Sequence, residues 1–200
     1  EVTGVQTCAL PIYKNGRLYG ENTDGKGFVA ALKASGTELS GKKITILGAG
    51  GAARAIAAEC ALNGASDIVI INRNKERGQE LAQLICHKTK CAGSYLEWKS
   101  QVQIPRGTEI LINATSAGFS PNIKDKPDID YSSITENICV CDVVFNPAET
   151  VFLTKAAKQG AKIVNGLGML VRQAALNFTL WTGEEAPLAI MEEALKKEFQ

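Results

Sequence analysis

A glycine-rich segment in the first half of the chain has the spacing of a phosphate-binding loop. Gly48, Gly50 and Ala53 fit a GxGxxA pattern in the sequence GAGGAA, between a β-branched run and an alanine-rich helical pattern. The first glycine permits a tight turn, the second lets the backbone approach a pyrophosphate, and the alanine lets the helix pack on the strand. Free N–H groups at the helix start then bind phosphate oxygens. The segment predicts a dinucleotide site, and the alternative is a purely structural glycine turn.

Two arginines stand where such a site distinguishes NAD from NADP. About twenty residues beyond the glycines, an NAD site has an Asp or Glu that binds the ribose 2′-hydroxyl, and this carboxylate would repel the 2′-phosphate of NADP. Here the residues are Asn72, Arg73 and Asn74, and Arg77 follows Arg73 by one helical turn. Two guanidinium groups can bind a phosphate through charge-assisted hydrogen bonds. We predict NADP; the alternative is that both arginines are solvated, with Arg77 partly paired to Glu76.

The elements around these residues alternate between strand and helix patterns. Short β-branched runs predict strands, and helical patterns lie between them. The expected strands are 42–48, 66–72, 108–114, 138–145 and 161–165, and the expected helices are 51–63, 75–86 and 149–159. This alternation favours an α/β fold that is Rossmann-like and doubly wound, with a mainly parallel sheet and helices on both faces. The segment 116–130 is the one long loop, and such loops are often functional.

Two further helical segments lie outside this alternation. One covers 22–34 and is opened by Thr23 or Asp24 as a cap. The other begins near Leu167 and carries Gln173 on its polar side. We expect four parts: a leader (1–12), a hinge segment (13–40), a nucleotide-binding domain (41–165) and C-terminal helices that return to another domain (166–200).

The composition is that of an ordinary globular chain. Lys and Arg number 22 against 21 Asp and Glu, so the net charge is +1 and no long-range field favours nucleic acid or an anionic membrane. No apolar run has the length of a spanning helix or the form of a secretion signal, which predicts a cytoplasmic protein. The six cysteines form no CxxC pair and are expected to be reduced core thiols. A Cys86–His87–Cys91 zinc site lacks a fourth ligand, so we predict no metal.

Taken together, five motifs resemble the shikimate dehydrogenase family. They are Asn22–Gly25 (NTDG), the GAGGAA loop, Asn72–Arg73, Asn113–Ser116 (NATS), and Gly166–Leu170 (GLGML) leading to Gln173. The combination of NTDG with GLGML is far more specific than the glycine loop, and the resemblance runs from about Gly16 to near the C-terminus. It implies an enzyme that reduces 3-dehydroshikimate to shikimate with NADPH, on the way to aromatic amino acids.

The resemblance also implies a role for each matching position. Asp24 matches a catalytic aspartate that pairs with a lysine and hydrogen-bonds the substrate, and such a carboxylate keeps the lysine placed for proton transfer. Thr23, Phe145 and Gln173 match substrate-side positions. The matching cofactor positions are Gly48, Ala49, Gly50, Gly51, Ala52, Asn72, Arg73, Asn74, Arg77, Thr115, Val143, Gly166 and Met169. Without the resemblance, Asp24 would be interpreted as a helix cap and Gln173 as part of a solvated face.

Two positions depart from the family pattern. Asn74 stands where the family often has threonine, which removes a hydroxyl from the 2′-phosphate site, and Phe145 replaces a frequent tyrosine on the substrate side. A quinate/shikimate dehydrogenase with relaxed use of NAD and NADP is therefore one alternative. The nucleotide domain of glutamyl-tRNA reductase is another, which NTDG and GLGML disfavour. A non-catalytic NADP-sensing module is the third.

The segment before NTDG also departs from the family. The family has a substrate-binding domain there, with the catalytic lysine. Here only Lys14 precedes Asp24, without matching the lysine motif, and residues 1–12 resemble translated sequencing-adapter read-through. We therefore expect this chain to be the cofactor-binding part without its N-terminal substrate domain. It should bind NADP(H), turn over little shikimate or 3-dehydroshikimate alone, and be able to form a homodimer.

Overall fold

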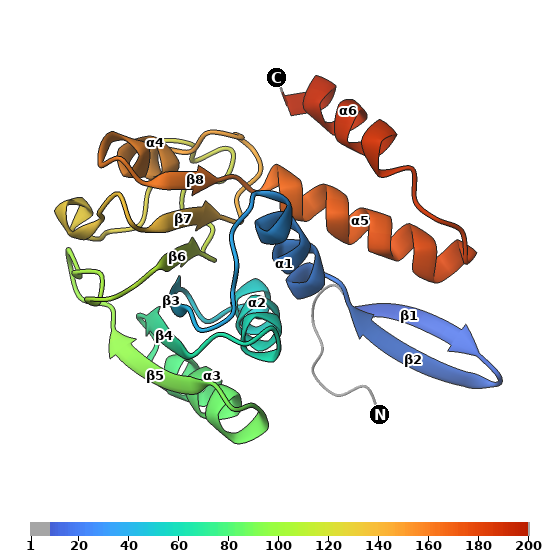
Figure 1. The fold of residues 1–200 in the computed structure, drawn as a ribbon, viewed down its shortest axis with the longest axis horizontal. Helices are drawn as coiled ribbons and strands as arrows, with labels where there is room; N and C mark the ends of the chain where they lie inside the picture. Colours follow the sequence, from blue (N-terminus) through green and yellow to red (C-terminus); the bar gives the residue numbers. More distant parts are fainter. Residues whose placement is uncertain (1–8, 200) are drawn as a thin grey trace.

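A six-stranded parallel sheet organises the structure, a computed structural model that describes residues 9–199 (Figure 1). The strand order is β5-β4-β3-β6-β7-β8, and every neighbouring pair is parallel. The strands are β3 (Lys43–Leu47), β4 (Asp67–Asn72), β5 (Ala92–Glu97), β6 (Ile110–Asn113), β7 (Cys139–Asp142) and β8 (Lys162–Val164). The predicted fold class is confirmed. The order reverses between β3 and β6, the point at which such sheets bind ligands.

Helices cover both faces of this sheet, but unequally. They are α1 (Asp24–Ala34), α2 (Gly51–Leu62), α3 (Lys75–Lys88), α4 (Val151–Lys158), α5 (Leu167–Thr182) and α6 (Leu188–Phe199). On one face, α1, α2 and α3 bury Ile44 and Ile46 of β3. On the other face, Phe152 of α4 packs beside irregular segments that contribute Ile104 and Ile129. The segment between β6 and β7 forms the expected long loop, with only a short 3-10 turn at Tyr131–Ser133.

Most predicted elements are present with shifted ends, and the differences have local causes. The expected strand 138–145 stops at Asp142, whose carboxylate accepts a hydrogen bond from the N–H of Val144 (3.0 Å) and turns the backbone out of the sheet. Strand β5 escaped prediction because AGSYLE lies at the sheet edge, where most of its residues are exposed and its apolar pattern is weak.

A hairpin precedes α1. Strands β1 (Ala9–Lys14) and β2 (Arg17–Asn22) pair antiparallel, and both turn residues, Asn15 and Gly16, have positive φ (52° and 74°). This is the geometry for which Asn-Gly is favoured in two-residue hairpins. Part of the expected leader, 9–12, therefore lies in β1, whereas 1–8 lies outside the described residues. The division into leader, hinge, nucleotide domain and C-terminal helices stays a prediction.

Two glycines of the hinge segment permit close helix packing. A Cβ on Gly25 would overlap the carbonyl oxygen of Ala55 in α2, and one on Gly27 would lie 2.8 Å from the backbone nitrogen of Gln173 in α5. Helix α1 is thus wedged between α2 and α5 (Figure 1). The packing explains in physical terms why the NTDG segment has a glycine after its aspartate.

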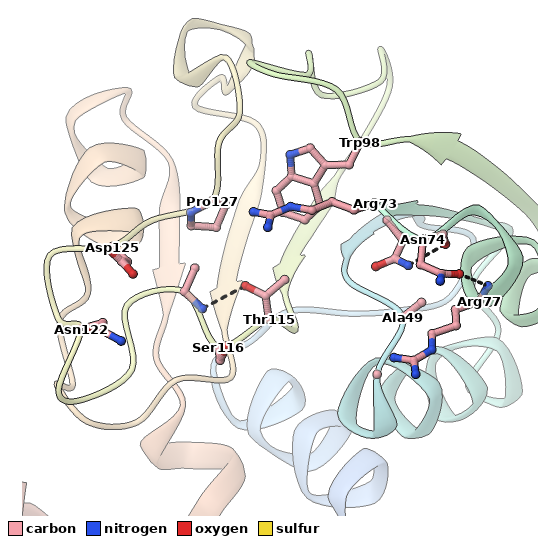
Figure 2. Close-up of a pocket in the computed structure, with 13 residues that line it drawn as sticks. Ala49, Arg73, Asn74, Arg77, Trp98, Thr115, Ser116, Asn122, Asp125 and Pro127 are labelled. Atoms are coloured by element: carbon pink, nitrogen blue, oxygen red, sulfur yellow. Dashed lines mark hydrogen bonds between the residues drawn. The ribbon is translucent and has the colours of Figure 1, made fainter.

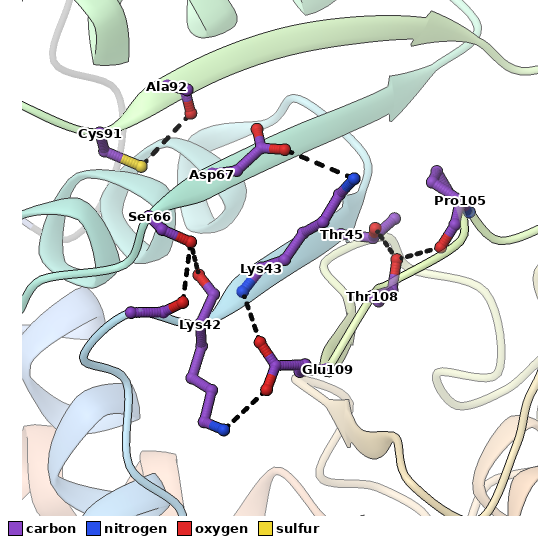
Figure 3. A network of polar contacts seen from close by, with 11 residues as sticks. Lys42, Lys43, Thr45, Ser66, Asp67, Cys91, Ala92, Pro105, Thr108 and Glu109 are labelled. Carbon is purple, nitrogen blue, oxygen red and sulfur yellow. Dashed lines mark hydrogen bonds and ion pairs between the residues drawn. The ribbon is translucent and has the colours of Figure 1, made fainter.

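The amino ends of the strands are held by paired charges and hydroxyls (Figure 3). Glu109 pairs with Nζ of Lys42 (2.7 Å) and accepts from the N–H of Lys43 (3.1 Å), so these hydrogen bonds lower the pKa of its carboxyl group. The hydroxyls of Thr45 and Thr108 hydrogen-bond at 2.8 Å. This polar network lies at the end of the sheet opposite the carboxyl ends of the strands.

The sequence also led to expectations about membrane spans, thiols and metal sites. Within residues 9–199, no helix combines the length and apolar character needed to span a membrane. The thiols of Cys60, Cys91, Cys139 and Cys141 are free and buried, and that of Cys86 is free and exposed. The described residues contain no cluster of three or more side chains that could hold a metal ion.

Candidate dinucleotide-binding site

A cavity of about 440 Å³ lies at the carboxyl ends of β3, β4 and β6 (Figure 2). It is the place where the strand order reverses. Seven of the predicted cofactor residues line it: Ala49, Gly50, Asn72, Arg73, Asn74, Arg77 and Thr115. Of the other six lining residues, Ser116 belongs to the NATS motif, whereas Trp98, Ala117, Asn122, Asp125 and Pro127 had not been singled out. Ala117, Asn122, Asp125 and Pro127 come from the long loop, whose length was its only signal in the sequence.

The glycine loop has the backbone that a phosphate site requires. Gly48 has φ of 107°, and a Cβ there would lie 3.0 Å from the carbonyl oxygen of Ala114. Gly50 is the N-cap residue of α2, and a Cβ on it would meet nothing within 4 Å. Ala53 is fully buried where α2 packs on the sheet. Because no side chain caps α2, its first N–H groups are available to an anionic ligand at the cavity.

The two arginines extend from the end of β4 and the first turn of α3 into this cavity (Figure 2). Within residues 9–199, no ion pair uses Arg73 or Arg77, so the partial pairing of Arg77 with Glu76, which belonged to the alternative interpretation, is absent there. The guanidinium of Arg73 lies over the indole of Trp98, 5.6 Å from the ring centroid. The cavity is therefore positively charged beside the glycine loop, where a 2′-phosphate needs neutralisation.

The asparagines beside the arginines have structural partners. The side-chain oxygen of Asn74 accepts a hydrogen bond from the N–H of Arg77 (2.9 Å) and so caps α3. The side-chain amide of Asn72 donates to the backbone oxygen of Asn74 (2.8 Å). These bonds fix the turn that presents Arg73 and Arg77, and within residues 9–199 Oδ1 of Asn72 and Nδ2 of Asn74 make no hydrogen bond.

A buried polar network supports the loops after β6 and β7. The carboxylate of Asp142 accepts from Nδ2 of Asn113 (2.9 Å) and from the hydroxyl of Thr150 (2.6 Å). Burial raises the pKa of Asp142 to about 6, although these hydrogen bonds and the one from Val144 act in the opposite direction. The other end of the Asn113 amide accepts from the hydroxyl of Thr115 (2.6 Å), a lining residue. Asp142 and Thr150 had not been singled out, although Asp142 is a polar residue at the end of a buried strand.

The predicted catalytic and substrate residues lie on the α1–α5 pair and the loop after β7. Thr23 donates its hydroxyl hydrogen bond to Oδ1 of Asn177 (2.5 Å), and Asp24 is buried at the start of α1. Gln173 lies where α5 touches Gly27 of α1. No ion pair within residues 9–199 uses Asp24. Thr23, Asp24 and Gln173 do not line the cavity.

Two of the residues predicted to lie near the nicotinamide, Val143 and Gly166, meet at a second contact. A Cβ on Gly166 would lie 2.6 Å from the carbonyl oxygen of Val143, so the start of α5 packs directly on the loop after β7. In the same loop, the ring of Phe145 makes edge-to-face contacts with Phe119 of the long loop and with Phe199 of α6. The distances between ring centroids are 5.3 Å and 5.8 Å. Gly48, Gly51, Ala52, Val143, Gly166 and Met169, the remaining predicted cofactor residues, do not line the cavity either, and their roles stay predictions.

The fold and the cavity define a Rossmann-like unit in which two arginines lie beside a glycine-rich loop. The family model described as "Shikimate / quinate 5-dehydrogenase" matches residues 30–127, and the model for the C-terminal domain of shikimate 5′-dehydrogenase matches 166–196. The chain belongs to the shikimate dehydrogenase family, as its motifs indicated. The second match argues against a glutamyl-tRNA reductase domain.

Three related proteins illustrate the likeness. The shikimate dehydrogenase (NADP(+)) of Desulforamulus reducens is 41% identical over 190 residues, covering 94% of this chain and 65% of the relative. The ligand-free 5-ketofructose reductase of Gluconobacter sp. strain CHM43 is 44% identical with a TM-score of 0.87 (93% and 66% covered). A shikimate dehydrogenase in complex with NADP+ is 38% identical with a TM-score of 0.83 (94% and 65% covered). The chain thus spans just under two thirds of the length of these proteins, and NADP, the predicted cofactor, is named for two of them.

Proposed function

We propose that this chain binds NADP(H) and forms the cofactor half of an enzyme that reduces 3-dehydroshikimate to shikimate. The observation that carries the proposal is the pair of arginines, Arg73 and Arg77, beside the glycine loop in one cavity. No carboxylate within residues 9–199 neutralises them. The family assignment and the relatives named for NADP support the same cofactor.

Each part of the site has a distinct task in this proposal. The N-terminus of α2 binds the pyrophosphate, while Arg73 and Arg77 bind the 2′-phosphate. The bound cofactor supplies the hydride. Val143, Gly166 and Met169 are placed against the nicotinamide, and Phe145 and Gln173 against the substrate. Asp24 hydrogen-bonds the substrate hydroxyl and pairs with a lysine. The family carries this lysine in its substrate-binding domain, and the lysine donates the proton.

The cofactor part of the proposal is tested by titrating the purified chain with NADPH and with NADH at moderate salt. We expect NADPH to bind at least about tenfold more tightly, because the 2′-phosphate adds charge-assisted hydrogen bonds. Arg73→Ala should remove most of this preference. Arg106→Ala is the matched control, because this arginine lies in a different cavity near the amino end of β6. Equal affinities of the unaltered chain for NADPH and NADH would refute the role of the arginines.

A second candidate concerns the substrate. The relative with a TM-score of 0.87 is a 5-ketofructose reductase, and Phe145 lacks the hydroxyl that the family often has at this position. A reductase for another polyhydroxylated ketone, or a quinate/shikimate dehydrogenase with relaxed cofactor use, fits these two observations. Relative rates with shikimate, quinate and 5-ketofructose, each with NADP and NAD, in a protein that carries a substrate domain would separate the candidates.

Location and assembly stay predictions from the sequence. We propose a cytoplasmic enzyme that needs no nucleic-acid or membrane partner and that is able to form a homodimer. Sedimentation of the purified protein over a range of concentrations would test the dimer.

A further inference from the structure

The contact between Arg73 and Trp98 joins two elements that are not neighbours in the sequence. Trp98 is the first residue after β5, and Arg73 is the first residue after β4. The arginine Cζ lies 5.6 Å from the centroid of the indole, within the range of a cation–π interaction. In Figure 2 the guanidinium lies against the indole at the edge of the cavity.

Trp98 is held by two hydrogen bonds, one from its backbone and one from its ring. The backbone N–H of Trp98 donates to the oxygen of Asn72 (3.2 Å), the residue directly before Arg73. The ring N–H of Trp98 donates to the backbone oxygen of Asp128 in the long loop (3.0 Å). The ring also packs on the core of the second sheet face. Trp98 is therefore a fixed surface against which the flexible side chain of Arg73 can rest.

This surface orients the arginine without neutralising it. A carboxylate partner would compete with a phosphate for the guanidinium N–H groups, whereas an aromatic ring occupies one face and leaves the edge donors available. An arginine that is already oriented also loses less conformational freedom when it binds its ligand. Asp125 lines the same cavity, and no ion pair within residues 9–199 joins it to Arg73.

We propose that Trp98 is a positioning residue that sets the preference for NADP over NAD by holding Arg73 at the 2′-phosphate position. The inference rests on the proposed NADP site and adds to it a residue from a different strand. It predicts that changes at Trp98 act on the 2′-phosphate alone, because the glycine loop and its pyrophosphate contacts belong to other elements.

The test measures the dissociation constants of NADPH and NADH for the purified protein and for variants at position 98. Trp98→Ala should weaken NADPH binding about fivefold, a typical effect for a partly exposed cation–π contact, and leave NADH binding within twofold. Trp98→Leu keeps apolar packing without a π face and should behave like Trp98→Ala, which also decides the matter if the alanine variant does not fold. Trp98→Phe should retain most of the NADPH preference.

A double variant separates positioning from general support of the fold. In an Arg73→Ala background, Trp98→Leu should cause no further loss of NADPH affinity, because the residue through which it acts is gone. Equal weakening of NADPH and NADH, or additive losses in the double variant, would overturn the role of Trp98. If the unaltered protein does not prefer NADPH, the proposed NADP site is wrong and this inference fails with it. If Arg73→Ala removes the preference but Trp98→Leu does not, only the role of Trp98 fails.

Discussion

At the scale of single residues, Asp142 shows how burial and hydrogen bonding oppose each other at the edge of the site. Its carboxyl group is 2% exposed and accepts hydrogen bonds from Asn113, Thr150 and Val144. These donors favour the charged form, but desolvation outweighs them and raises the pKa from 3.8 to about 6. The same carboxylate connects the loop that carries Thr115 with the loop that carries Phe145.

The raised pKa predicts how Asp142 changes stability with pH. The folded state binds this proton more tightly than the unfolded state, so the contribution of Asp142 is fully present below pH 3.8 and is lost as pH rises through about 6. The difference between pKa values of 3.8 and about 6 corresponds to at most roughly 3 kcal/mol in the free energy of unfolding. Asp142→Asn should remove this part of the pH dependence between pH 4 and about 6, measured as the free energy of unfolding in urea.

An exposed aspartate provides the control for this measurement. Asp125→Asn changes the same charge on the surface of the long loop and should leave the pH dependence close to that of the unaltered protein. If the stability curves of the Asp142→Asn variant and the unaltered protein run parallel over this pH interval, the carboxyl group does not titrate as described.

At the scale of elements, the sequence was most informative where the structure of a segment depends on residues close together in the chain. The glycine loop and the start of α2 depend on residues a few positions apart. Strand β5 was missed because an exposed edge strand carries little apolar signal, and the end of β7 was misplaced because Asp142 bonds to the loop beyond it. A pattern of apolar residues reports neither an exposed edge strand nor a side-chain hydrogen bond that ends a strand.

The packing of α1 against α2 leads to a prediction about Gly25. Gly25→Ala would place a methyl group on the carbonyl group of Ala55, whose carbon would lie 2.8 Å from the added Cβ. Forcing the two helices apart should destabilise the protein by about 1–3 kcal/mol, which a urea titration measures. Gly20→Ala is the control: a Cβ there meets nothing within 4 Å, and its effect should stay within about 0.5 kcal/mol. A loss no larger than the control's would contradict the packing argument.

At the scale of the whole molecule, the sheet positions the candidate cofactor cavity, and none of the lining residues comes from the hairpin, α5 or α6. The cofactor cavity lies at the point where the strand order reverses, between loops from β3, β4 and β6. The hairpin, α5 and α6 extend away from the sheet on one side (Figure 1). These elements expose large apolar side chains, including Leu18 (62%), Trp181 (61%) and Ile190 (68%). A substrate domain of the kind found in the family would cover such a surface.

This arrangement predicts that the 200-residue chain alone turns over little or no shikimate. It contains the cofactor residues, but Asp24 has no lysine partner within residues 9–199, so proton transfer and positioning of the substrate are both deficient. The measurement is NADP+ reduction by shikimate with the chain alone and with a family substrate domain fused before β1. Turnover at the level of the fused protein by the chain alone would refute the prediction. Absence of turnover in both, despite NADPH binding, would favour the NADP-sensing module.

Patterns of neighbouring residues were enough to predict the glycine loop, the arginines after β4, the alternation that builds a parallel sheet, and the motifs that define the family. Other contacts follow only from the tertiary structure: Trp98 lies against Arg73, Asp142 joins the loops after β6 and β7, and Phe145 meets Phe119 and Phe199. These residues come from separate elements, and their distances follow from the strand order and from helix packing. Neither the contact of Arg73 with Trp98 nor the hydrogen bonds of Asp142 produce a periodic pattern in the sequence. These interactions form only when the folded sheet brings the ends of its strands together.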